Sequence, residues 1–343
     1  MERLPVSVSA TRAAAAMLLA SAWLLSATPG HALDGPLRVR NSFPLVSILD
    51  APSPEPAAYR DSLSLGLTHS SVDFIESDNG FDFRIDTEVT ELEIGYRKTV
   101  SDAFEFGVEV PLRSFGSGFL DRGIDRFHRA FGIDSGKAGE SANRFFFEVR
   151  KDGQTVLRGE SGRVGLGDAR GYVKRSLFSA GGFAAAIMAD VELPTGSAKK
   201  GYGNGSVDGK IAFLADWKPV ERIGIHANAG YVFAGDIRGY TRLPVDNFRY
   251  AALAVEAALP ARGSLVGQYF IQDSPLPREG LTFPSLKKRP ALVSLGYRYA
   301  SDRYIYEFSI TENIKPAFAP DLMLNVTITR KPSPGRLPAR PGP

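Results

Sequence analysis

The residues in this chain whose types and spacing first suggest catalytic chemistry are a histidine and the two serines that follow it. The 343-residue sequence has four histidines and no cysteine, which excludes a thiolate nucleophile or a thiolate metal site. His69 precedes Ser70 and Ser71, but a serine–histidine pair is recognised by its geometry rather than by adjacency. His128 and His226 are isolated, without the paired spacing of a zinc motif. We predict no catalytic residue, no metal and no cofactor, and we retain a lipid-acting enzyme that uses His69 or His128 as an alternative.

Charged side chains form a second chemical feature, because they alternate with apolar residues along many segments. In residues 206–218, for example, Val207 and Ile211 alternate with Asp208 and Lys210. Such period-two alternation indicates a strand with one apolar face and one polar face. Mixed charges of this kind pair across a small interior, whereas an open pore is lined by rings of one sign. The polar faces carry charges of both signs, at Glu105, Glu109, Arg170, Lys174, Asp208, Lys210, Asp216, Glu256, Arg298 and Glu307.

The connections between the alternating segments indicate the fold. From residue 61 to residue 330, tight turns alternate with long loops, which is typical of a transmembrane β-barrel. We predict an all-β fold, a transmembrane antiparallel up-and-down β-barrel of about 12 strands within a range of about 10 to 14. The charged residues above would line its lumen, which we expect to be narrow or plugged. The predicted strands are 61–73, 83–98, 103–112, 166–178, 182–194, 206–218, 221–234, 247–259, 263–273, 290–300, 303–313 and 320–330, and a hairpin at 144–160 would raise the count to 14 if it joined the wall.

The apolar residues of the predicted strand 83–98 change phase along its length. Ile85 falls on one face and Ile94 falls on the other. We expect either a β-bulge near Thr90–Glu91 or a long strand that rises beyond the bilayer.

Two observations favour lipid, rather than a soluble core, as the environment of the apolar faces. Most predicted strands are about 10 to 14 residues long, which suits a tilted crossing of a bilayer, whereas soluble strands average about five or six residues. Aromatic residues also gather near the tight turns, as an interfacial girdle requires. A soluble periplasmic β-protein is the alternative. The girdle residues are Tyr96, Phe104, Phe178, Phe183, Trp217, Tyr299 and Tyr304.

The two ends of the chain differ from the barrel segment. Residues 1–32 have the basic, apolar and small-residue order of a secretory signal peptide. Residues 33–60 are rich in proline, and we predict an extended arm that is periplasmic or enters the lumen. Residues 331–343 are predicted to be a disordered tail. The ends carry net charges of +1 and +3, which leaves −1 for residues 33–330 and gives no electrostatic footprint for nucleic acid.

A long outer loop at 113–143 contains a helical pattern. Apolar residues recur at the spacing of one helix face, and charged residues fill the other face. We predict a short amphipathic helix that caps the mouth, folds into the lumen or lies against the outer leaflet, with simple packing inside the loop as the alternative. Its candidate residues are Asp121, Ile124, Phe127, His128 and Phe131.

Several motifs together resemble an uncharacterised bacterial outer-membrane barrel family that is described only as a domain of unknown function. The resemblance implies a barrel in the outer membrane of a Gram-negative bacterium and supplies no activity. The motifs are Pro36-Leu37 with Arg40-Asn41 and Pro44-Leu45, Phe119-x-Asp121-x-x-Ile124-x-x-Phe127-His128-x-x-Phe131-Gly132, Gly165-Leu166-Gly167-Asp168, and Leu193-Pro194-Thr195-Gly196.

The combined prediction is an outer-membrane β-barrel protein that acts as a narrow or plugged channel, or as a structural or surface-interaction barrel, without catalysis. Its expected partners are outer-membrane lipid, lipopolysaccharide and the barrel-insertion machinery, with no nucleic acid. Because the chain continues past Ile328 into the tail, we expect the insertion signal to lie in the internal strand Leu322–Ile328. The sequence leaves the oligomeric state and any transported solute open.

Overall fold

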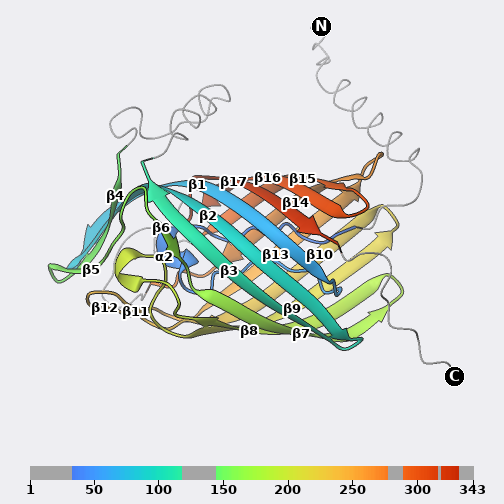
Figure 1. The fold of residues 1–343 in the computed structure, drawn as a ribbon, viewed down its shortest axis with the longest axis horizontal. Coiled ribbons are helices and arrows are strands. Elements are labelled where there is room, and N and C mark those ends of the chain that lie inside the picture. The colour runs from blue at the N-terminus through green and yellow to red at the C-terminus, as the bar shows by residue number, and fades with distance from the viewer. Residues whose placement is uncertain (1–32, 118–143, 277–288, 316–317, 332–343) are drawn as a thin grey trace, which may run out of the picture.

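The computed structural model describes residues 33–117, 144–276, 289–315 and 318–331. Its main element is a closed antiparallel barrel of 12 strands (Figure 1), as predicted. Strand β1 pairs with β17, and this pairing closes the wall. The wall strands are β1 (Ser62–Asp78), β2 (Phe81–Ser101), β3 (Phe104–Gly116), β7 (Ala169–Ala180), β8 (Phe183–Leu193), β9 (Asp208–Val220), β10 (Ile223–Phe233), β13 (Phe248–Ala258), β14 (Gly263–Gln272), β15 (Ala291–Ala300), β16 (Tyr304–Lys315) and β17 (Leu322–Arg330).

The tight turns lie at one end of this barrel, called here the turn end, and the long connections lie at the other, called the loop end. The loop end carries the remaining elements of the described chain. The hairpin of β4 and β5 pairs with the far end of β2, before the β2–β3 pairing begins at Glu88, so it does not join the wall and the 14-strand alternative is wrong. These elements are β4 (Phe146–Lys151), β5 (Gln154–Arg158), β6 (Val164–Leu166), the 3-10 helix η1 (Ala198–Lys200), β11 (Ile237–Arg238) and β12 (Arg242–Leu243).

Strand β2 explains the change of phase seen in the sequence. Its register with β1 is unbroken from Arg97 to Phe81, so the predicted bulge near Thr90–Glu91 is wrong and a single strand of 21 residues is present. Phe83 and Arg97 are both buried and lie an even number of residues apart, whereas Ile94 is 45% exposed. The same alternate positions therefore point inward along the whole of β2. What changes along the strand is which face carries the apolar residues. Near the loop end the barrel interior is an apolar core, whereas nearer the turn end the apolar side chains are outside.

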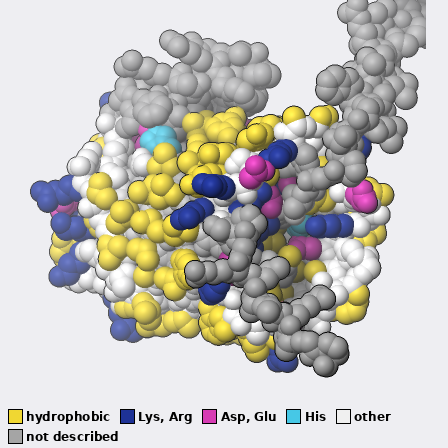
Figure 2. Space-filling view, turned by 45° about the vertical axis from the view of Figure 1, so that its right-hand side comes forward, with side chains coloured by type: hydrophobic (Ala, Val, Ile, Leu, Met, Phe, Trp, Pro, Cys, Tyr) yellow, Lys and Arg dark blue, Asp and Glu magenta, His cyan; other side chains and the backbone are white. Residues whose placement is uncertain are grey.

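The outer face of the wall is apolar over most strands. Side chains such as Leu65, Ile211, Leu253 and Val293 are 42–54% exposed, and Figure 2 shows hydrophobic side chains covering much of the visible surface. The predicted girdle residues all lie on this outer face, where Phe178 and Phe183 are 6.1 Å apart between ring centroids. No helix among the described residues is long and apolar enough to cross a membrane.

Residues 33–60, called here the arm, lie inside the barrel. The arm's helix α2 (Pro44–Ser47) is at the loop end, on the left in Figure 1. Proline at the first helical position suits this start, because its missing N–H is not needed there. The four helix residues are buried, and two of them, Leu45 and Val46, belong to an apolar cluster with side chains of the wall and of the loop-end elements. This cluster includes Phe43, Leu45, Phe83, Phe115, Val156 and Phe270.

Candidate functional site

The arm enters and leaves the barrel at the turn end. Its first residues are held there by Glu256, whose carboxylate accepts hydrogen bonds from the backbone N–H groups of Asp34 and Gly35 at 2.8 and 3.0 Å. Arg298 donates to the carbonyl of Gly35 at 3.0 Å. The last residue, Arg60, forms an ion pair with Asp34 at 2.8 Å. Between these points the chain reaches α2 and returns, so that the arm forms a loop inside the lumen.

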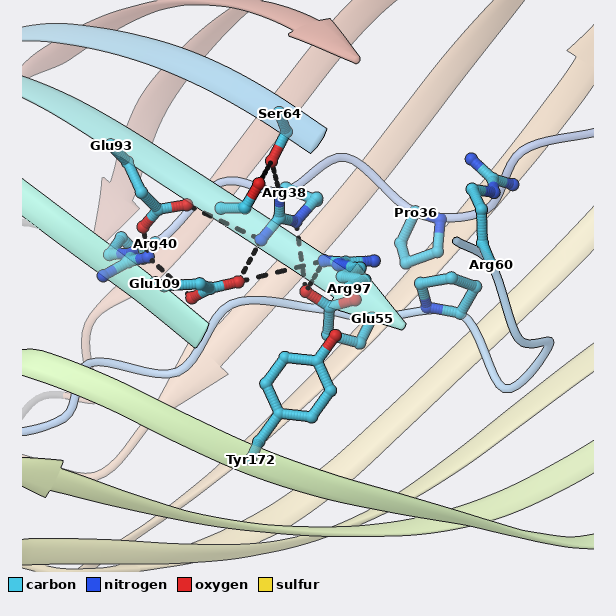
Figure 3. Close-up of polar contacts among 12 residues, drawn as sticks. Pro36, Arg38, Arg40, Glu55, Arg60, Ser64, Glu93, Arg97, Glu109 and Tyr172 are labelled. Atoms are coloured by element: carbon cyan, nitrogen blue, oxygen red, sulfur yellow. Dashed lines mark hydrogen bonds and ion pairs between the residues drawn. The ribbon is translucent and has the colours of Figure 1, made fainter. Parts of the chain in front are cut away.

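Glu109 of β3 is the centre of the largest group of charges (Figure 3). Its carboxylate forms ion pairs with Arg38 and Arg40 of the arm and with Arg170 of β7. Arg38 and Arg40 also reach Glu93 of β2. The side chains of Glu109 and Arg170 are only 4% and 5% exposed, so these charges have little access to water and depend on one another.

The returning part of the arm is bound through both its backbone and its side chains. The amide of Asn228 on β10 receives a hydrogen bond from the N–H of Glu55 at 2.7 Å and donates one to the carbonyl of Glu55 at 3.0 Å. Because one side chain satisfies both backbone groups, the arm is bound here much as it would be by a neighbouring strand. The Glu55 carboxylate accepts a hydrogen bond from Arg97 at 2.5 Å and another from Arg38 at 3.1 Å.

Asp50 is the arm's second buried acid. It pairs with Arg170 at 3.1 Å and with Lys210 of β9 at 3.0 Å, and its N–H donates to Glu192 at 2.9 Å. Lys210 also pairs with Asp190 of β8 at 2.6 Å. A cavity of about 10 Å³, room for roughly one water molecule, remains beside these groups. The arm therefore fills this part of the lumen almost completely.

The structure places the charged residues that the sequence predicted for the lumen on the inner side of the wall. They form several separate groups rather than one ring. Lys174 pairs with Glu105 at 2.9 Å, and Arg298 joins Glu256 to Glu307. Two further residues of the predicted set, Asp216 and Asp208, do not pair with Lys174 or Arg298. Asp216 lies 2.7 Å from His226, and Asp208 accepts a hydrogen bond from Asn204 at 2.7 Å. The predicted loop-helix residues Asp121, Ile124, Phe127, His128 and Phe131 lie outside the described residues.

Sequence reasoning named none of the arm's charged residues as a site candidate, although Arg40 belongs to one of the motifs that carry the resemblance. The arm has no period-two pattern, so nothing in it indicated that Arg38, Arg40, Asp50 and Glu55 would be buried or half-buried. Arg97 of β2 was also missed, although its alternation with Tyr96 is a usable signal. Among the described residues, no group of three or more acidic or histidine side chains could hold a metal ion.

Two of the sequence motifs meet at the loop end. The carboxylate of Asp168 accepts hydrogen bonds from the N–H groups of Gly196 at 2.7 Å and Asn204 at 2.9 Å. The hydroxyl of Thr195 receives one from the N–H of Ala169 at 2.9 Å and donates to the carbonyl of Gly167 at 2.7 Å. Burial raises the pKa of Asp168, while the hydrogen bonds from the two N–H groups oppose that rise. These contacts join the start of β7 to the loop that follows β8, and we call them the clasp.

His69 and Ser70 do not form a catalytic pair. The His69 ring nitrogens lie 2.8 Å from the Thr90 hydroxyl and 2.8 Å from the Glu88 carboxylate. Ser70 is fully buried and receives a hydrogen bond from Ser42 of the arm at 2.7 Å. Because consecutive strand residues point to opposite faces, the two side chains lie on different sides of the wall.

The family model described as Protein of unknown function (DUF3187) matches residues 16–331. The chain belongs to this family. The DUF3187 barrel is similar in fold to the COG4313 outer membrane channel from Pseudomonas putida F1, at 12% identity and a TM-score of 0.53, over 80% of this chain and 96% of that chain. Two further solved structures match less well. The NanC porin matches at 8% identity and a TM-score of 0.44, over 78% of this chain and 98% of that chain. The CymD monoaromatic hydrocarbon channel matches at 9% identity and a TM-score of 0.43, over 87% of this chain and 94% of that chain. No curated protein matches the sequence. The fold is thus that of an outer-membrane channel-like barrel.

Proposed function

We propose that this protein is an outer-membrane channel that its own N-terminal arm holds closed. The apolar outer wall supports a place in a bilayer, with the turn end in the periplasm. The arm supports the closed state, because it fills the lumen between the two ends of the barrel. An enzymatic role has less support, since the sequence-adjacent His69 and Ser70 lie on opposite sides of the wall.

The observation that carries the proposal is that three cations of the wall have a carboxylate of the wall within 4 Å, in addition to their partners on the arm. Arg170 retains Glu109, Arg97 has Glu109 at 3.9 Å, and Lys210 retains Asp190 at 2.6 Å. Each of these cations thus has a carboxylate of the wall itself as a neighbour. A buried charge that loses its partner typically costs about 3–5 kcal/mol, and this arrangement avoids that cost for the three cations. For these three cations an arm-free lumen is therefore electrostatically tolerable, whereas Glu93 of the wall would lose both of its arginine partners.

The apolar part of the arm makes the closed state the resting state. Five large side chains around α2 are almost completely buried, and withdrawal would expose them to water. At about 1.5–3 kcal/mol for each side chain, their exposure would cost about 8–15 kcal/mol. Opening therefore requires an applied voltage, a ligand or another protein. The five residues are Phe43, Leu45, Val46, Ile48 and Leu49.

A reversible crosslink tests the proposal on the full-length protein. The hydroxyls of Ser42 and Ser70 are 2.7 Å apart, and the chain has no native cysteine, so the double variant Ser42→Cys/Ser70→Cys places its only two thiols at this contact. In planar bilayers under applied voltage, we expect stepwise conductance after reduction and none in the oxidised form.

A charge reversal provides a second way to release the arm. Arg38→Glu/Arg40→Glu places two acids beside Glu93 and Glu109, so the arm should be expelled and conductance should appear without a crosslink. Lys218→Glu, a reversal of the same sign at the exposed end of β9, is the control and should remain closed. If the folded protein conducts in none of these forms, the channel proposal is wrong and a purely structural barrel is the better reading.

A further inference from the structure

The inner wall of the barrel carries mostly charged side chains on one set of strands and neutral polar side chains on another. Strands β2 to β10 carry most of the charged groups described above. Strands β13 to β17 instead carry a set of neutral polar side chains nearer the loop end, called here the neutral stripe. Each of its members is at most 6% exposed. They are Tyr250, Gln268, Gln272, Ser309 and Asn325.

The neutral stripe has more hydrogen-bonding capacity than the protein uses. Among the described residues, no group bonds to either amide atom of Gln268 or of Gln272, to the hydroxyls of Tyr250 and Ser309, or to the amide nitrogen of Asn325. Buried polar side chains are satisfied in the large majority of cases, so such a concentration in one sector of a lumen requires an explanation.

These side chains share one surface because their strands are neighbours in register. Gln272 pairs across strands with Tyr250. Gln268 is opposite Ser294, and Ser309 is opposite Asn325. The stripe therefore has members on four strands, β13, β14, β16 and β17, on the inner face.

The arm covers this surface with an apolar side chain. A Cβ atom at Gly296 would lie 2.6 Å from Leu37 Cδ2, so Leu37 packs directly on the backbone of β15 at that point. Gly296 is opposite Ser309 in register. A leucine cannot satisfy the Ser309 hydroxyl opposite that point, whereas a polar occupant of the same space could.

We propose that the neutral stripe is the solute-binding wall of the open channel and that it binds uncharged, hydroxyl-rich solutes of the sugar class. Amide groups both donate and accept hydrogen bonds, as do hydroxyls, so they match a solute that is itself built of hydroxyls. The stripe offers no charge that would favour an ion over a neutral molecule. This inference rests on the proposed function, because a solute reaches the stripe only after the arm withdraws.

The test uses full-length Arg38→Glu/Arg40→Glu protein in liposomes, with D-glucose and acetate, an anion without hydroxyl groups, as probes. Replacing Gln268 and Gln272 by leucine in this background should reduce glucose flux about fivefold or more and leave acetate flux and ion conductance within about twofold. Tyr269→Phe, which removes a hydroxyl from the outer face of the same strand, is the matched control and should change neither flux.

The outcomes separate the two proposals. Conductance with glucose flux that is insensitive to both leucine substitutions would overturn the solute assignment and leave the channel intact. An equal loss of glucose flux and of ion conductance would also overturn it, because the effect would then be steric. Absence of conductance in every arm-released form would refute the channel itself, and the solute proposal with it.

A second measurement is independent of opening. In the closed form, the double substitution Gln268→Leu/Gln272→Leu removes amide groups that have no protein partner. The thermal unfolding temperature should therefore rise or remain unchanged. A fall of several degrees would show that the two amides have stabilising partners in the closed state, and the inference would fail.

Discussion

Arg60 and Asp34 form an ion pair of 2.8 Å although they are 26 residues apart and stand at opposite ends of the arm. Their contact brings both ends of the arm to the turn end, where β1 begins at Ser62. An arm connected in this way cannot pass through the barrel to the loop end. It can leave only by withdrawing toward the turn end, which directs any opening signal to that side.

Glu109→Gln should destabilise the folded barrel by about 1.5–3 kcal/mol. The substitution removes the one carboxylate that Arg38, Arg40 and Arg170 share, although each guanidinium group keeps another carboxylate, Glu93 for Arg38 and Arg40 and Asp50 for Arg170. Urea unfolding in a lipid or detergent system that refolds reversibly measures the difference. Glu160→Gln, in an exposed pair with Arg163, should cost less than about 1 kcal/mol, and equal losses in the two variants would contradict the buried network.

Asn228→Ala should loosen the returning part of the arm and leave the barrel wall intact. The change removes both hydrogen bonds to the backbone of Glu55, at a cost of about 1–3 kcal/mol. Hydrogen–deuterium exchange should become faster at the Glu55 amide and remain unchanged in β14 and β15. Asn228→Asp keeps the acceptor but loses the donor, so it should give an intermediate rate. Unchanged exchange in both variants would show that Asn228 does not hold the backbone of Glu55.

Ile94→Lys should reduce stability by about 2 kcal/mol, because it places a charge on the lipid-facing surface of β2. Arg84 points to the same outer side near the loop end and is already charged, so Arg84→Gln should change stability by less than about 0.5 kcal/mol. Refolding into liposomes with the two variants in parallel measures both values. Similar effects at the two positions would be incompatible with a bilayer that covers only the part of β2 nearer the turn end.

The stability that the clasp gives to the folded state should depend on pH through the titration of Asp168. Because burial raises the pKa of this acid above its ordinary value of 3.8, the folded state holds the proton more tightly than the unfolded state does. The resulting stabilisation is complete below pH 3.8 and is lost as the pH rises through the raised pKa. Asp168→Asn should abolish this contribution, so the stability difference between variant and wild type should change over that window. A difference that is constant from pH 3 to pH 8 would show that Asp168 does not titrate there.

The wall of the barrel was predictable because a bilayer imposes a simple rule on every strand. Residues such as Ile211 and Val293 had to face hydrocarbon, and their neighbours two positions away had to do the same, so the alternation could be read from residue order alone. The same rule left two alternatives open at β2, and the long strand is the one present. Ile85 and Ile94 lie in opposite phases, and one local sequence cannot distinguish a bulge from a strand that leaves the bilayer.

The sequence by itself determined the fold class and the inward direction of ten charged side chains, because these depend on a local period. Only the tertiary structure decided between 12 and 14 strands, placed the arm inside the lumen and settled which charges meet. Arg38 and Glu109 are 71 residues apart, and their pairing exists only once the wall has closed around the arm. A proline-rich segment has the same local appearance in water and inside a barrel. Its position is selected by the buried partners that distant strands bring to it, and no local pattern records them.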